Sequence, residues 1–172
     1  MSEEAFKRLG EELAKVAVDS DMAAKQLQTI YQLVKRKPLA FVETHLKRQM
    51  SRDIPGKAGF KKALEILNMY RDDKASLEKT LMYAVMLYDY VKRKPAIDLE
   101  VSAEPIVKRV LNRRGIGYGG LKTDISGGSC RIEVKARRFH GSPKQLSMEI
   151  ERELKKNEMF SGLNLSVWIK ME

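Results

Sequence analysis

The chain is poor in the residues that build disulfide frameworks and zinc sites. Its 172 residues include one cysteine, Cys130, and two histidines, His45 and His140. One thiol cannot form an internal disulfide, and one cysteine with two histidines does not make up a zinc site. We therefore expect no metal, no other cofactor, and the reducing, cytoplasmic setting in which unpaired thiols are common.

Long apolar segments are also missing. No apolar run approaches the roughly 20 residues that a helix needs to span a bilayer. The N-terminal segment MSEEAFKRLGEEL is acidic and amphipathic, which is unlike a secretory signal. We therefore expect no membrane partner.

Positive charge, by contrast, is in excess. The net charge is +10 and the isoelectric point is about 9.7. The excess is uneven, because residues 1–20 carry a net charge of −2, residues 21–95 carry +8 and residues 96–172 carry +4. Such a balance favours a polyanionic partner, most often a nucleic acid. The alternative is an organism whose proteins are generally rich in lysine and glutamate.

The first part of the chain has helical spacing and little glycine. Apolar residues recur every three to four positions, and Pro38 and Pro95 interrupt the pattern. We expect an N-terminal five-helix bundle over residues 1–94. Its helices are predicted at residues 3–18, at a segment that ends with Lys35–Lys37, at about 39–50, at a segment holding Phe60 to Leu67, and at 76–94.

Beyond Pro95 the pattern changes to a mixture of alternating and helical spacing. The fold class is therefore predicted as α+β, with a second domain over residues 96–172. The order βαββαβ corresponds to a small ferredoxin-like domain. Its expected elements are strands at 97–101, 121–125, 131–139 and 164–171, helices at 104–112 and 142–159, and a turn at Gly127-Gly128.

The segment RRGIGYGG, residues 113–120, contains the G-x-G-x-x-G pattern of dinucleotide-binding loops. That fingerprint needs a strand before the glycines and a helix after them. Here a predicted helix precedes the glycines and a predicted strand follows, so we discard a nucleotide site.

Two other interpretations of this segment remain. In an RNA-binding KH domain a G-x-x-G loop joins two helices, and Gly117 to Gly120 has that form, so a KH-like C-terminal domain is the alternative fold. The simpler interpretation is a helix-to-strand connection in which Gly115 caps the helix and the later glycines form a hairpin tip or a bulge. Either way, exposed N–H groups beside Arg113, Arg114 and Lys122 would suit an anion.

Catalytic chemistry has little support in the sequence. Asp72-Asp73 is typical of a solvated turn, and Cys130 is typical of a small buried residue. His45 is predicted within a helix and His140 in a loop. A histidine-based ribonuclease would need both groups together, which a sequence does not show. We expect a protein without enzymatic activity.

Three basic clusters are the clearest candidates for binding. Helix dipoles explain about one cation at each helix C-terminus, but not three. If the second and fifth helices end on the same side, their clusters would form one stripe that neutralises phosphates without reading bases. The clusters are Lys35-Arg36-Lys37, Lys47-Arg48 with Arg52, and Lys92-Arg93-Lys94.

Residues 22–94 resemble the small helical subunit of type III-A CRISPR effector (Csm) complexes. The resemblance is carried by MAAKQLQTIYQLVKR (22–36), KPLAFVETHLKRQMSRD (37–53) and LEKTLMYAVMLYDYVKRK (77–94). It implies a non-catalytic subunit whose copies stack in a filament beside the guide RNA, with other subunits of the complex as partners. It also implies that basic residues track the RNA phosphates, at positions matching Lys35, Arg36, Lys47, Arg48, Arg52 and Lys92–Lys94.

The leading hypothesis is thus a sequence-independent RNA-binding subunit of a CRISPR interference ribonucleoprotein that serves antiviral defence. One alternative is a stand-alone RNA-binding protein that grips RNA with Arg113, Arg114 and the glycine segment. Another is a DNA-binding regulator, because a short turn at residues 35–39 joins two helices as in a helix-turn-helix. The sequence leaves open whether single-stranded DNA could replace RNA.

Overall fold

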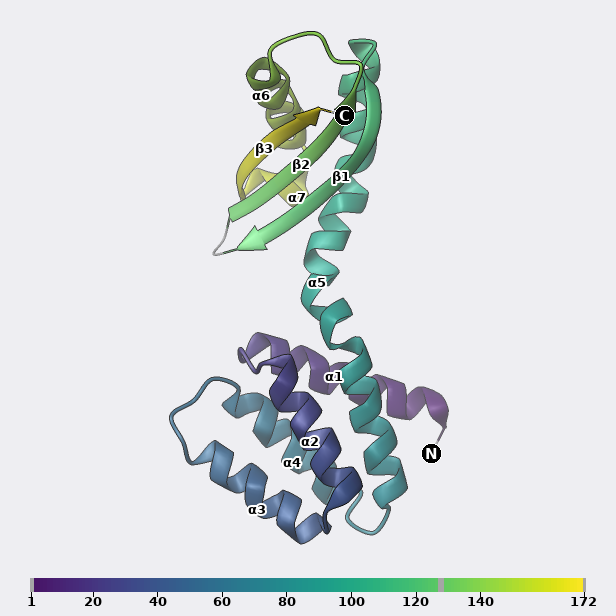
Figure 1. The fold of residues 1–172 in the computed structure, drawn as a ribbon, viewed down its shortest axis with the longest axis vertical. Helices are drawn as coiled ribbons and strands as arrows, with labels where there is room; N and C mark the ends of the chain where they lie inside the picture. Colours follow the sequence, from purple (N-terminus) through teal and green to yellow (C-terminus); the bar gives the residue numbers. More distant parts are fainter. Residues whose placement is uncertain (1, 127–128, 172) are drawn as a thin grey trace. The chain divides into compact units, whose positions relative to one another are not determined.

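The computed structural model describes residues 2–126 and 129–171 as an α+β protein in two compact units, Met1–Arg93 and Lys94–Glu172. The boundary lies next to Pro95, where the composition changes. The elements, labelled in Figure 1, are α1 (Glu3–Asp19), α2 (Ala24–Arg36), α3 (Leu39–Met50), α4 (Lys57–Met69), α5 (Lys74–Arg113), β1 (Gly117–Ser126), β2 (Ser129–Arg137), α6 (Pro143–Leu154), α7 (Glu158–Ser161) and β3 (Asn164–Met171).

The first unit is helical. Its four complete helices lie where the sequence predicts helices, with ends shifted by a few residues. Each turns its apolar side toward one shared core, as Leu27, Ile30 and Val34 of α2 illustrate. The buried hydroxyl of Tyr88 on α5 donates a hydrogen bond to the carbonyl of Met22 at 2.5 Å, which ties α5 to the connection before α2.

The fifth helix is much longer than predicted. It does not end at Lys94 but continues to Arg113, with Pro95 and Pro105 inside it. The strand predicted at residues 97–101 is therefore wrong, and the ferredoxin-like order βαββαβ is not found among the described residues.

A helical period explains why the strand prediction failed. Leu99, Ala103 and Val107 are buried at intervals of four, whereas Val101 is 67% exposed although the alternating pattern places it with Leu99. An ion pair four residues apart, between Lys94 and Asp98 at 3.1 Å, also supports the helix. Burial of the helix face that carries Leu99 thus favours a helix more strongly than the five-residue alternation favours a strand.

The second unit holds a three-stranded sheet in the order β1-β2-β3. β1 and β2 are antiparallel, whereas β2 and β3 are parallel and are joined through α6 and α7, since a parallel pair needs a crossover connection. Cys130, Ile132 and Val134 of β2 are fully buried, which agrees with the structural role expected for the cysteine. The predicted turn at Gly127-Gly128 lies outside the described residues.

The glycine segment is a helix cap followed by a strand. Gly115 has a φ of 68°, and the Ile116 N–H donates to the Leu111 carbonyl at 3.0 Å, so the predicted glycine cap is confirmed. Gly117 already belongs to β1, and the pairing with β2 shifts between Tyr118 and Gly120, which is a β-bulge. The G-x-x-G loop of the KH interpretation is wrong, because these glycines join no second helix.

Candidate nucleic-acid interface

The α2–α3 hairpin, residues 24–52, carries much of the positive charge of the helical unit. It contains seven lysines and arginines and one acidic residue, Glu43. The two helices are joined by only Lys37 and Pro38, so the basic C-terminal end of α2 lies close to the first turn of α3. This hairpin holds two of the three basic clusters.

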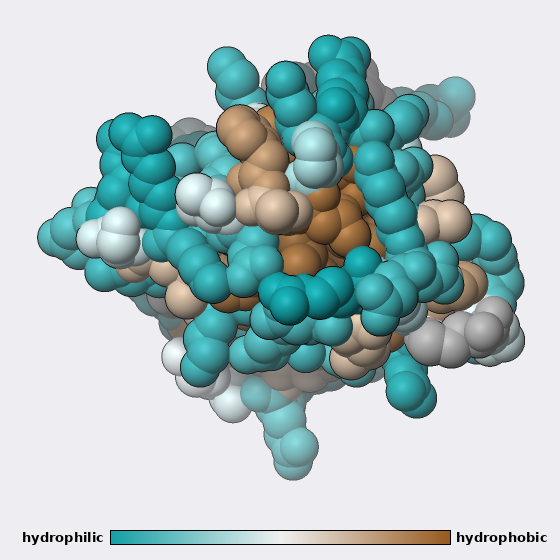
Figure 2. Space-filling model, turned by 90° about the horizontal axis from the view of Figure 1, so that it is seen from below, coloured by the Kyte–Doolittle hydropathy of each residue, from teal (hydrophilic) through white to brown (hydrophobic). Residues whose placement is uncertain are grey.

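Burial separates the two sides of the hairpin. Its apolar residues, such as Val34 and Leu46, are in the core, whereas the basic ones face solvent. Figure 2 shows one face of the molecule on which hydrophilic side chains surround a small hydrophobic area. The exposed basic residues of the hairpin are Lys25, Lys35, Arg36, Lys37, Lys47, Arg48 and Arg52.

A stripe of exposed side chains follows the outer side of α3. The Lys37 Nζ lies 5.8 Å from the centre of the Phe41 ring, and that ring is 51% exposed. Arg48 follows Phe41 by seven residues, which is two helical turns and therefore the same side. We call Lys37, Phe41 and Arg48 the α3 stripe. It offers two cations and a flat apolar surface to a ligand.

Glu43, the one acidic residue of the hairpin, is neutralised within the protein. Its carboxylate oxygens lie 2.6 Å from Lys47 Nζ and 2.7 Å from an Arg71 guanidinium nitrogen. The hydrogen bond from Lys47 and the charge of Arg71 hold the pKa of Glu43 below its usual value. Lys47 is therefore engaged by Glu43, whereas no salt bridge in the described residues involves Arg36, Lys37 or Arg48.

Lys92-Arg93-Lys94 does not join this surface. The Lys74 Nζ donates to the Lys35 carbonyl at 3.4 Å, so α2 ends beside the first turn of α5. Lys92 lies 18 residues further along α5, which is about 27 Å at 1.5 Å per residue. The predicted stripe formed by the ends of the second and fifth helices is therefore wrong. The cluster lies within α5 rather than at its end.

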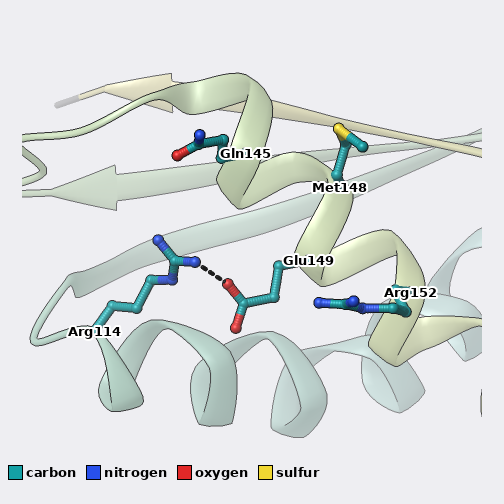
Figure 3. A pocket seen from close by; sticks show the side chains of 5 residues that line it. All are labelled: Arg114, Gln145, Met148, Glu149 and Arg152. Atoms are coloured by element: carbon teal, nitrogen blue, oxygen red, sulfur yellow. Dashed lines mark ion pairs between the residues drawn. The ribbon is translucent and has the colours of Figure 1, made fainter.

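The residues around the glycine segment belong to the other unit, and Arg114 is already paired there. Its guanidinium lies 2.5 Å from the carboxylate of Glu149 on α6. Figure 3 shows the two side chains pointing toward each other in a pocket that Arg152 also lines. Arg113 ends α5, and Lys122 is exposed on β1 opposite Glu133. The three predicted residues therefore do not share one open loop.

The two histidines lie in different units of the chain. His45 lies on α3, and burial, with a smaller effect of Arg48, lowers its pKa. His140 lies between β2 and α6. No group of three or more His, Cys, Asp or Glu side chains in the described part of the chain could hold a metal ion. Burial also raises the pKa of the Cys130 thiol, which keeps it in its unreactive protonated form.

No family model, curated protein or solved structure matches this chain. The resemblance to the small CRISPR subunit therefore stays a prediction. Among the described helices, none combines the length and the apolar character needed to cross a bilayer.

The aromatic residues of the candidate interface were not among the residues predicted from the sequence. Besides Phe41, Tyr31 carries a cation over its ring, with the Lys35 Nζ 5.5 Å from the ring centre. Tyr31 and Lys35 are four residues apart on one predicted helix, and that spacing was a usable signal, because it brings a lysine over a ring. Lys37 and Phe41 lie on opposite sides of Pro38, so no helical spacing predicted their contact.

Proposed function

We propose that this protein is a non-catalytic RNA-binding protein that recognises RNA without regard to sequence. In this proposal the helical unit forms a five-helix bundle, and its α2–α3 hairpin contacts the phosphates. The observation that carries the proposal is the α3 stripe, in which Lys37 and Arg48 are exposed, form no salt bridge with any described residue and flank an exposed Phe41.

The chemistry of this surface explains the absence of sequence preference. Lysine and arginine bind phosphate through charge, which every nucleotide carries. An aromatic ring can stack on any base, because every base has a π face.

We further propose that the protein works as the small subunit of a type III CRISPR interference complex. This rests on the resemblance of residues 22–94, with which the basic hairpin is compatible. In that setting the hairpin would follow the RNA paired to the guide, and copies of the chain would stack head to tail in a filament. The partners would be RNA and the other subunits of the complex.

Binding to fluorescently labelled single-stranded RNAs of equal length tests the RNA-binding function. We expect RNAs of unrelated sequence to bind within about threefold of each other. Each neutralised phosphate contributes about 0.7 to the slope of log affinity against log salt. About four contacts therefore predict a slope near −3. Affinity that is insensitive to salt, or a strong preference for a defined DNA duplex, would contradict the proposal; the second result would favour a DNA-binding regulator.

A further inference from the structure

The sheet of the second unit has one covered side and one open side. Ile132 and Val134 of β2 and Leu165 and Val167 of β3 are buried in the core that α5, α6 and α7 share with the sheet. The helices α6 and α7 are drawn behind the strands in Figure 1. Since side chains alternate along a strand, the residues between these buried positions face away from the helices.

Trp168 lies on this open side, midway along the edge strand β3. It is the one tryptophan of the chain and is 55% exposed. The guanidinium carbon of Arg131, on the neighbouring strand, lies 4.3 Å from the ring centre, which is a close cation–π contact. Arg131 thus fixes the orientation of the indole and leaves over half of it open to solvent.

The open side is positively charged around that ring. Glu133 is the register partner of Trp168, and the Lys170 Nζ lies 3.9 Å from the Glu133 carboxylate. The charged residues on this side number five basic and two acidic. They are Lys122, Asp124, Arg131, Glu133, Lys135, Arg137 and Lys170.

We propose that the open side of the sheet binds single-stranded RNA, with one base stacked on Trp168. The arrangement combines an exposed aromatic ring in mid-strand with a surplus of cations, which is the chemistry that holds unpaired bases and their phosphates. Glu133 beside the ring would repel phosphate but can accept a hydrogen bond from a ribose 2′-hydroxyl, a group that DNA lacks. The site goes beyond the function proposed for the hairpin and rests on different residues.

The composition of this face favours RNA over a protein partner. On the open side of the described strands Trp168 is the only large apolar side chain. Protein interfaces are depleted of lysine and of acidic residues at their centre. Here charged residues lie beside the tryptophan on β2, and Lys170 follows it on the same side of β3, which suits a polyanion with flat bases.

The emission of Trp168 reports directly on this site in the full-length protein. We expect a short oligouridylate to quench it on binding, because a stacked base contacts the indole. The quenching should persist in the variant with Arg36, Lys37 and Arg48 all changed to Glu, since the hairpin lies in the other unit. A variant that no longer binds RNA through the hairpin but still shows quenching of Trp168 would therefore show that the two sites are separate.

Substitutions test the stacking. Trp168→Ala is made in the variant whose Arg36, Lys37 and Arg48 are already changed to Glu, so that the hairpin no longer binds RNA. There it should weaken binding of labelled oligouridylate about 5- to 150-fold, the factor that corresponds to the loss of one stacked base. Trp168→Phe should retain most of the affinity, because a phenyl ring also stacks. Met171→Ala is the matched control, since Met171 is exposed on the same strand but alternates to the other side.

Three results would overturn the inference. The first is unchanged Trp168 emission at an oligouridylate concentration that saturates the protein. The second is equal affinity of Trp168→Ala and Met171→Ala, with unaltered far-UV circular dichroism showing that both fold. The third is equal quenching by oligouridylate and oligothymidylate. It would show that the ribose 2′-hydroxyl does not contribute to binding and that the site does not prefer RNA.

Discussion

Reversing the charge of Arg36, Lys37 and Arg48 to glutamate is expected to lower RNA affinity of the helical unit by at least about a hundredfold. Each substitution removes one phosphate partner and adds a repelling charge. All three residues are exposed, and no salt bridge in the described chain involves them. Their replacement should therefore leave folding intact, and fluorescence polarisation with a long labelled RNA would measure the loss.

The matched control changes the same number of exposed cations elsewhere in the helical unit. Lys7 and Arg8 lie on the acidic helix α1, and Lys61 lies on α4. The control with these three changed to Glu has the same net charge as the hairpin variant. It should lose less than about tenfold in affinity, through the weaker long-range field alone. Equal losses in the two variants would show that net charge, not the hairpin, governs binding.

Replacing Gly10 with alanine is expected to destabilise the helical unit by about 2–3 kcal/mol. A Cβ at this position would lie 2.8 Å from the Thr80 carbonyl oxygen and 2.6 Å from the Tyr83 Cβ, both on α5. Because these atoms belong to the backbone or adjoin it, α1 and α5 would have to separate. The free energy lost by separating the two helices should exceed the gain of about 1 kcal/mol that alanine brings to an α-helix in place of glycine.

Gly59→Ala is the informative comparison for Gly10→Ala. The nearest atom to a Cβ at position 59 is the Met22 Cε at 2.7 Å, the end of a flexible side chain. Met22 can move aside, so this variant should change the free energy of unfolding by less than about 1 kcal/mol. Urea unfolding followed by far-UV circular dichroism would measure both. Similar stability of the two variants would refute the close contact between α1 and α5.

Much of the local structure could be predicted from residue patterns. The strand predicted at 164–171 is β3, and its apolar alternation agrees with burial, since Leu165 and Val167 are buried whereas Trp168 is exposed. The left-handed cap at Gly115 was also predictable, since glycine after a basic helix end has few other roles. Such features depend on neighbours within a few residues, which is why sequence alone shows them.

The course of α5 was not predictable in the same way. Pro95 removes one helical hydrogen bond and usually ends a helix. The helix continues because Leu99 and Val107, one and three turns later, are buried against the sheet of the second unit. That gain depends on residues 25 to 68 positions away, such as Ile132 and Val167, and no local pattern reveals it.

The arrangement of the basic residues also depended on tertiary structure. A helical period shows which side of a helix is exposed, but not which helix ends lie together. The contact between Lys74 and the end of α2 removes Lys92 from the hairpin surface. The pairing of Glu43 with Arg71, 28 residues later, likewise depends on tertiary structure and follows from no local pattern.

Acetylation of lysines in the presence and absence of RNA tests most directly whether the hairpin is the RNA-binding surface. It uses the unmodified sequence and reads each residue separately by mass spectrometry. We predict that saturating RNA protects Lys35 and Lys37 strongly, whereas Lys7, Lys15 and Lys61, which are also exposed in the free protein, stay reactive. Unchanged reactivity of Lys35 and Lys37 while RNA is bound would contradict the account.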